Sequence, residues 1–118
     1  MGQPVMHFEI GCRNREKSAK FYSTLFGWKT EEFGPALMID TGNKTGIQGH
    51  FNSLSHEPHH YVTFYIQVED IKDHLNKIEK LGGKTMIPKT EVPGAGHFAW
   101  FSDLDGNCVG LWTPMQVQ

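Results

Sequence analysis

The stretch HFEIGCRN at residues 7–14 is matched in pattern by TFYIQVED at residues 63–70, and this pair decides the fold. In both stretches apolar residues alternate with polar or aromatic ones, which is the period of a β-strand with two different faces. Phe8 and Ile10 share one face of the first strand, whereas His7 and Glu9 share the other. The offset of 56 residues between the two stretches predicts two copies of one module.

Each predicted strand leads into a predicted helix. Asn14 and Asp70 suit N-cap positions, because a short side-chain oxygen accepts hydrogen bonds from the first amides of a helix. Gly27 and Gly82 stand where a helix takes a left-handed C-cap. The apolar stripes at helical spacing consist of Ser18, Phe21, Tyr22, Leu25 and Phe26 in the first copy, and of Ile71, Leu75, Ile78 and Leu81 in the second.

The rest of each copy is predicted to form strands and tight turns, with a hairpin at Asp105-Gly106. Each module is therefore β-α-β-β-β, at about residues 4–52 and 61–115, joined by a polar linker at about 52–60 that contains Pro58. We expect a single α+β domain over residues 1–118. Its two βαβββ modules should form a curved mixed sheet with a concave cavity and outer helices.

Composition excludes several classes of function. A net charge of -2 and a pI near 6.4 give no basic face for nucleic acid. The longest apolar runs, such as residues 36–39, are too short to span a membrane. The N-terminus shows no signal peptide, and two cysteines in a chain that builds its own core favour reduced thiols. We therefore expect a cytoplasmic protein without nucleic-acid or membrane partners.

Three features resemble the vicinal-oxygen-chelate superfamily, which includes glyoxalase I, bleomycin-resistance proteins and extradiol dioxygenases. They are His7 in the first strand, the phrase FYSTLFGW at residues 21–28, and the closing DLDGNCVGLW at residues 103–112. The final GLW is similar to that of the members related to lactoylglutathione lyase. The resemblance implies the paired βαβββ fold. It is less specific for function, because the superfamily includes isomerases, dioxygenases, thiol transferases and proteins that only sequester a drug.

The resemblance also implies four cavity-facing metal-ligand positions, which this chain fills poorly. His7 stands at the first position, but Thr63 replaces a usual His and Gly110 replaces a usual Glu. The remaining position falls on Gln48 or, in another register, on His50. Because no carboxylate remains there to hold a hard ion, we expect no metal cofactor. A rearranged divalent-metal site made of His7, Glu9 and His50 is the alternative.

The predicted cavity face combines flat rings with a few hydrogen-bonding groups, which suits an uncharged or weakly cationic organic ligand. His7 and Glu9 are the candidate catalytic residues, either of them as a general base. The candidate ligand-binding residues are Gln48, His50, Tyr61, Thr63, Tyr65, Cys108 and Trp112. The same rings would also suit a cavity that the protein fills with its own side chains, or a dimer interface.

The leading functional interpretation is a metal-independent protein that binds a small organic molecule; if it is an enzyme, it is a lyase or isomerase of glyoxalase type. A metal-dependent lyase or isomerase of that type, with the rearranged site, is the first alternative. A non-catalytic interaction module is the second. We also expect a homodimer, because Trp28, Trp100 and Trp112 provide more large aromatic surface than a small monomer needs to expose.

Overall fold

The computed structural model describes residues 2–53 and 61–116. The element order is β-α-β-β-β twice, so the predicted α+β class and the two βαβββ modules are confirmed. The elements are β1 (Val5–Gly11), α1 (Arg15–Phe26), β2 (Lys29–Phe33), β3 (Ala36–Asp40), β4 (Gln48–Asn52), β5 (Val62–Gln67), α2 (Ile71–Lys80), β6 (Lys84–Val92), β7 (Gly96–Ser102) and β8 (Cys108–Pro114). The part of the predicted linker at residues 54–60 lies outside the described residues. Among the helices described, none has the length and apolar character needed to cross a membrane.

The chain divides into two compact units. One unit runs from His7 to Thr63 and is called the first unit below. The second unit consists of the N-terminal segment up to Met6 together with the chain from Phe64 onward. Within the second unit, the Gln67 amide donates to the Pro4 carbonyl at 2.9 Å, which ties the N-terminal segment to β5.

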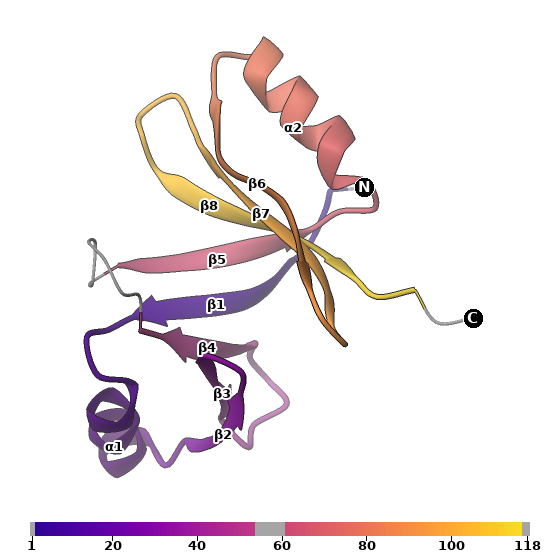
Figure 1. Cartoon of the computed structure of the whole chain (residues 1–118). Helices are drawn as coiled ribbons and strands as arrows, with labels where there is room; N and C mark the ends of the chain where they lie inside the picture. Colours follow the sequence, from indigo (N-terminus) through magenta and orange to yellow (C-terminus); the bar gives the residue numbers. More distant parts are fainter. Residues whose placement is uncertain (1, 54–60, 117–118) are drawn as a thin grey trace. The chain divides into compact units, whose positions relative to one another are not determined.

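The first unit contains a mixed sheet in the order β2-β3-β4-β1, with α1 beside it (Figure 1). β1 runs parallel to β4, and β3 pairs antiparallel with both β2 and β4. The parallel pair places Glu9 opposite His50. The core of this unit is formed by Cys12, Ala19, Leu37, Ile39 and Phe51, with Phe8, Ile10, Tyr22 and Trp28 packed against it.

Helix α1 begins and ends where the sequence predicts, but it packs by a different face. The Asn14 side chain accepts from the Lys17 amide, and Gly27 ends the helix with a φ of 73°. Ala19 is buried against the sheet, whereas Phe21 and Leu25 are 61% and 57% exposed. The predicted apolar stripe is therefore rotated, because the small Ala19 side chain lets the helix approach the sheet closely.

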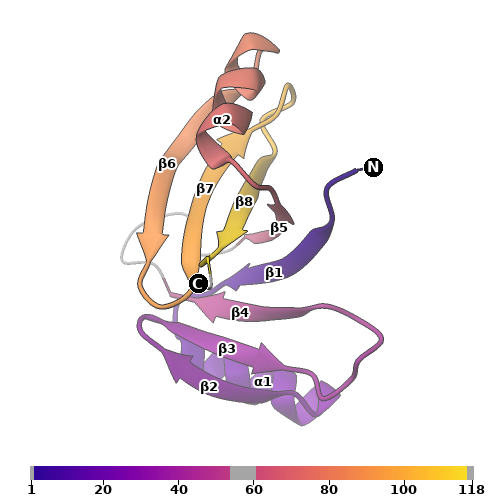
Figure 2. The ribbon, with the colours of Figure 1, turned by 90° about the vertical axis from the view of Figure 1, so that its right-hand side faces the viewer.

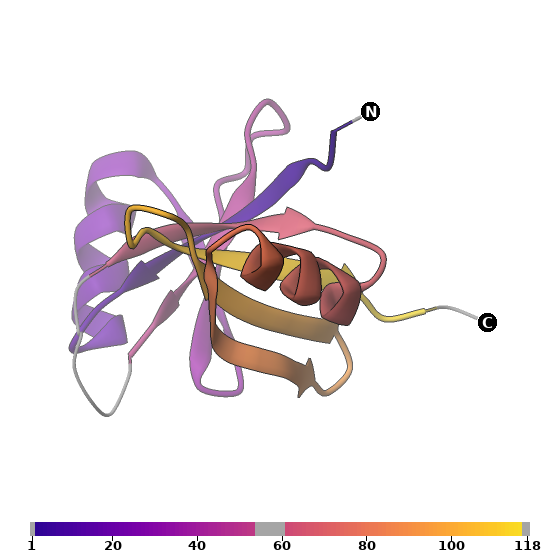
Figure 3. The same ribbon diagram turned by 90° about the horizontal axis from the view of Figure 1, so that it is seen from above.

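The second unit contains the corresponding sheet in the order β5-β8-β7-β6, in which β6, β7 and β8 run side by side (Figure 2). β5 and β8 are parallel, and the other two pairs are antiparallel. Helix α2 lies over one face of these strands (Figure 3), where its Ile71 and Leu75 pack against Ala99 and Leu111. Asp70 caps its start by accepting from the Asp73 amide. Its C-cap is Leu81, and the predicted left-handed glycine follows at Gly82, with a φ of 102°.

The strand faces agree with the predicted alternation. Phe8 and Ile10 pack against the core on the helix side, so His7 and Glu9 occupy the opposite face of β1. In the second unit Ile66 and Leu111 belong to the helix-side core, which leaves Tyr65 on the opposite face of β5. The polar face of β1 and β4 therefore carries most of the predicted site residues of the first unit.

Candidate functional site

The polar side chains of the first unit meet on one face of the parallel pair β1 and β4. Residues two apart on a strand share a face, and parallel neighbours in register lie side by side. The register pairs His7 with Gln48, Glu9 with His50 and Gly11 with Asn52. This arrangement brings two imidazole rings and one carboxylate together without a contribution from any loop.

These three groups form a chain of hydrogen bonds. The Nε2 atom of His7 lies 2.7 Å from Nδ1 of His50, and Nε2 of His50 lies 3.0 Å from Oε1 of Glu9. The centroids of the two rings lie 4.9 Å apart, and the ring planes are inclined by 29°. We call the group His7, His50, Glu9, Tyr61 and Asn52 the relay cluster.

The carboxylate of Glu9 is the most buried polar group of the cluster, with only 1% of its side chain exposed. Its second oxygen, Oε2, accepts hydrogen bonds from the hydroxyl of Tyr61 and from Nδ2 of Asn52, the latter at 3.4 Å. A buried carboxylate is tolerated when its oxygens receive such bonds. Burial and the hydrogen bond to Glu9 raise the pKa of Tyr61, so the phenol keeps its proton and donates it.

His7 is neutral at physiological pH. Burial, reinforced by the neighbouring His50, lowers the pKa of His7 to about 4, although the charge of Glu9 acts in the opposite direction. A neutral imidazole has one nitrogen that donates and one that accepts. His7 can therefore take up a proton, as a general base does.

When both rings are neutral, the hydrogen bonds determine which nitrogen of His7 can take up a proton. A carboxylate only accepts, so Nε2 of His50 must donate to Glu9. Nδ1 of neutral His50 is then an acceptor, and it receives the Nε2 proton of His7. The accepting nitrogen of His7 is consequently Nδ1. A proton that arrives there can be followed by transfer of the Nε2 proton to His50, whose ring contacts the carboxylate.

The relay cluster does not fit a divalent ion in the way that the resemblance implies. An ion needs donors that converge on one point. Here His50 uses one nitrogen toward His7 and the other toward Glu9, so the carboxylate lies on the far side of the ring from His7. Across residues 2–53 and 61–116, no three His, Cys, Asp or Glu side chains are grouped to hold a metal.

Gln48 lies outside the relay cluster, although it is the register partner of His7. Its Oε1 accepts from the Thr41 amide at 2.8 Å, and its Nε2 donates to the Thr41 hydroxyl at 3.2 Å and to the Asn43 carbonyl at 3.4 Å. The amide thus stabilises the turn after β3. The sequence left the fourth ligand position open between Gln48 and His50. Of these two residues, His50 is the one whose side chain contacts His7.

Thr63 closes the first unit and is buried, with 6% exposure. The other three predicted ligand-binding residues belong to the second unit. Tyr65 is buried on β5, whereas Cys108 and Trp112 on β8 are half-buried.

The ring of Tyr65 lies against Gly110, the position at which the resemblance implies a Glu ligand. A Cβ atom on Gly110 would stand 2.2 Å from Cδ2 of Tyr65, which is far inside van der Waals contact. The Tyr65 hydroxyl accepts a hydrogen bond of 2.8 Å from Nε1 of Trp100. The place of a carboxylate side chain is therefore filled by an aromatic ring whose position is fixed at both ends.

Sequence reasoning missed two residues with a clear part in these arrangements, Asn52 and Trp100. Asn52 follows His50 by two positions on the same strand, so the alternation already used for His7 and Glu9 would have placed it on the polar face. No local signal marks Trp100, because its partner Tyr65 lies 35 residues earlier in the chain.

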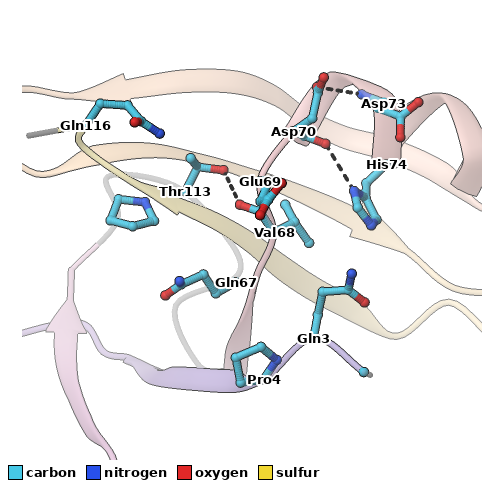
Figure 4. Close-up of a pocket in the computed structure, with 12 residues that line it drawn as sticks. Gln3, Pro4, Gln67, Val68, Glu69, Asp70, Asp73, His74, Thr113 and Gln116 are labelled. Atoms are coloured by element: carbon cyan, nitrogen blue, oxygen red, sulfur yellow. Dashed lines mark hydrogen bonds between the residues drawn. The ribbon is translucent and has the colours of Figure 1, made fainter.

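A separate hollow of about 490 Å³ lies in the second unit, between the N-terminal segment and the start of α2 (Figure 4). Its lining combines apolar residues such as Val68 with the polar side chains of Gln3, Gln67, Asp73 and His74. Several of these groups are engaged with the helix, since Asp70 receives the Asp73 amide and its carbonyl lies 3.1 Å from Nδ1 of His74. The hollow contains none of the predicted site residues.

Residues 5–111 match the sequence pattern of the Glyoxalase/Bleomycin resistance protein/Dioxygenase superfamily, and the chain belongs to that family. A glyoxylase-like domain-containing protein of Didymella fabae is 31% identical over an alignment 118 positions long that covers 92% of each chain. A putative glyoxylase, CFP32, of Mycobacterium bovis is 26% identical over 112 residues. That match covers 88% of this chain but only 43% of the mycobacterial one, so the chain spans less than half of that relative.

Solved structures agree with the fold. Methylmalonyl-CoA epimerase from Mycobacterium tuberculosis superposes with a TM-score of 0.67 at 11% identity, covering 95% of this chain and 88% of the other. A methylmalonyl-CoA epimerase in complex with methylmalonyl-CoA and NH4+ gives a TM-score of 0.68 at 14% identity, covering 100% and 99%. At these identities the comparison establishes a common architecture, and the predicted resemblance to the superfamily is confirmed.

Proposed function

We propose that the protein binds a small organic carbonyl compound at the relay cluster and moves a proton on it, as a lyase or isomerase of glyoxalase type, with His7 as the general base. The observation that carries this proposal is the series His7, His50 and Glu9, joined at 2.7 and 3.0 Å. An imidazole that is neutral at physiological pH and backed by a carboxylate is suited to general-base chemistry.

The proposed step removes a proton from a carbon atom next to the carbonyl group. Nδ1 of His7 accepts that proton, and the Nε2 proton of His7 moves to His50. The positive charge then lies on the ring that contacts the Glu9 carboxylate, so the buried charge is compensated. Delivery of the proton to the former carbonyl carbon of an α-hydroxycarbonyl compound completes an isomerisation, and departure of a neighbouring group with its bonding electrons completes a lyase reaction.

We further propose that this chemistry proceeds without a metal ion. The support is the arrangement of donors in series through His50, together with Thr63 and Gly110 at two positions where the family resemblance implies His and Glu ligands. Charge that develops on the substrate would be balanced by proton movement along the relay cluster. No step in the proposal uses a Lewis acid.

Thioesters with an acidic α-carbon are suitable first probes. One structure of the same fold is a methylmalonyl-CoA epimerase that holds methylmalonyl-CoA. Inversion at a carbon between two carbonyl groups begins with removal of a proton, which is the step proposed for His7. We take this compound as a probe of the chemistry, beside a panel of small aldehydes, ketones and hydroxyketones.

The test is deuterium exchange in heavy water. Wild-type protein is incubated with each compound, and loss of the α-proton signal is followed by NMR. The His7→Gln variant retains a donor for His50 but has no basic nitrogen, so we expect the exchange of a substrate to fall by about 10²–10⁴-fold. His97→Gln in the second unit serves as the matched control and should retain the wild-type exchange rate.

Two results would contradict the proposal. One is an exchange rate in His7→Gln equal to that of wild type. The other is a compound panel that leaves the NMR signals of His7 and His50 unmoved at millimolar concentration. In the second case the interaction-module interpretation would replace ligand binding.

We also propose that the protein is a homodimer, with α1 as part of the interface. The support is the large apolar side chains that α1 leaves exposed, Phe21 at 61%, Leu25 at 57% and Phe26 at 60%. Trp28 packs within the first unit, where its ring stacks on Tyr22 with centroids 5.3 Å apart and an interplanar angle of 4°. We therefore do not assign Trp28 to the interface. Contiguous exposed apolar residues on a soluble protein commonly mark a protein interface.

A further inference from the structure

We infer that Tyr61 is a positioning residue that orients the carboxylate of Glu9 toward His50, and that Gly11 provides the space this requires. The inference rests on the proposed function, because it assigns roles within the same relay cluster. It adds a residue that acts through Glu9 without contact with substrate, and a glycine whose missing side chain is essential to that role.

The two carboxylate oxygens of Glu9 have different partners. Oε2 accepts from the Tyr61 hydroxyl and from Nδ2 of Asn52 at 3.4 Å. Oε1 faces Nε2 of His50 at 3.0 Å. A carboxylate can rotate about its last bond, and a strong donor on one oxygen removes that freedom. Tyr61 therefore determines that Glu9 presents Oε1 to His50 and that it does so in a fixed direction.

Tyr61 is itself held in place by the end of β1. Its carbonyl accepts from the Gly11 amide at 2.9 Å, so the backbone beside the ring is fixed to the end of β1. The ring then lies directly over Gly11. A Cβ atom at Gly11 would stand 2.1 Å from Cε1 and 2.3 Å from Cδ1 of Tyr61. Since Gly11 has no positive φ, the requirement for glycine is one of space.

The orientation of the Glu9 carboxylate determines the tautomers of the two histidines. While Glu9 Oε1 accepts from Nε2 of His50, neutral His50 is restricted to one tautomer, and His7 is restricted in turn. Without the Tyr61 hydroxyl, Oε2 would keep the longer bond from Asn52, which holds the carboxylate less tightly, and the hydrogen bond to His50 would lose its direction. Both rings would then become mixtures of tautomers, and only part of the molecules would present Nδ1 of His7 as the base.

The experiment compares wild-type protein with Tyr61→Phe, labelled with nitrogen-15, at about pH 8.5, where ordinary imidazoles are neutral. The nitrogen shifts of His7 and His50 report the tautomer of each ring. We expect a single Nε2-protonated tautomer for both rings in wild type and a mixture in Tyr61→Phe. Tyr22→Phe, which removes a hydroxyl on the helix side of the same unit, should leave the wild-type pattern.

Gly11→Ala tests the second part, because its methyl group displaces the ring while the hydroxyl is kept. It should give the same loss of a single tautomer as Tyr61→Phe. If either variant fails to fold, the carbon-13 signal of the Tyr61 ring in wild type still tests the hydrogen bond. Burial and the proximity of Glu9, with a smaller contribution from Cys12, raise the pKa of Tyr61, so its signal should show no ionisation up to about pH 11.

Unchanged histidine tautomers in Tyr61→Phe, or ionisation of Tyr61 near pH 10 in wild type, would overturn the inference. Failure of the proposed function is seen separately, because it depends on deuterium exchange in His7→Gln and needs no change at Tyr61. A positioning role also predicts that Tyr61→Phe lowers kcat for an exchanging substrate while KM is retained.

Discussion

The lowered pKa of His7 makes the stability of the protein depend on pH in a calculable way. In the unfolded chain the pKa of His7 is near 6.5, and in the folded protein it is about 4. Between these values the unfolded state binds a proton that the folded state does not. The free energy of unfolding therefore falls as the pH is lowered through this window.

The size of the effect follows from the two pKa values. Linkage gives a loss of roughly 2.4 kcal/mol between about pH 7 and about pH 4.5. His7 is only half-buried, so solvent screening reduces this to about 2 kcal/mol. With a urea dependence of about 2 kcal/mol per molar, the midpoint of unfolding should move by about 1 M.

The assay is urea denaturation of wild type and His7→Gln at the two pH values. Wild type should lose about 2 kcal/mol more than His7→Gln on acidification, because the amide does not titrate. Trp28→Phe provides the control, since it weakens packing in the same unit without removing a titrating group. It should lower stability at both pH values and leave the pH-dependent difference intact. Equal losses in wild type and His7→Gln would refute the assignment of His7 as a buried neutral base.

Three further predictions concern metal, Gly110 and assembly. Elemental analysis of protein prepared without chelators should find well under one metal ion per chain, and added zinc should hardly raise Tm; a tightly held ion would favour the metal-dependent alternative. Gly110→Ala should lower the free energy of unfolding by about 1–3 kcal/mol, because its methyl group displaces the Tyr65 ring. Thermal unfolding equal to that of wild type would show that the ring has room to move. Light scattering should give a dimer for wild type and a monomer for the double variant Phe21→Ser with Leu25→Ser. A wild-type monomer at micromolar concentration would contradict the proposal of a homodimer.

The sequence predicted the fold well because the signals involved are local. Alternation in β1 placed Phe8 and Ile10 on the helix side, where they pack. The N-cap Asn14 and the left-handed Gly27 mark the ends of α1 in the structure as in the sequence. The face by which α1 packs was predicted wrongly, since apolar spacing alone does not weigh a small residue such as Ala19, which permits close approach.

The sequence named four of the five members of the relay cluster but missed Asn52 and the hydrogen bonds that join the members. The alternation of side chains along a strand placed His7 and Glu9 on one face, and His50 was retained as an alternative to Gln48. The bond between Tyr61 and Glu9 spans 52 residues and depends on the space above Gly11, so no local pattern reveals it. The same holds for the packing of the Tyr65 ring against Gly110. A glutamate introduced at Gly110 to complete a metal site would first have to displace the ring.

The distribution of tryptophans gives each unit its own optical signal. Trp28 lies in the unit from His7 to Thr63, stacked on Tyr22, whereas Trp100 and Trp112 lie in the other unit. In Trp28→Phe, indole fluorescence therefore comes only from the second unit. In a variant that lacks Trp100 and Trp112, it comes only from the unit that carries the relay cluster. The order in which the two modules fold and unfold can thus be followed with intrinsic fluorescence alone, without an attached dye.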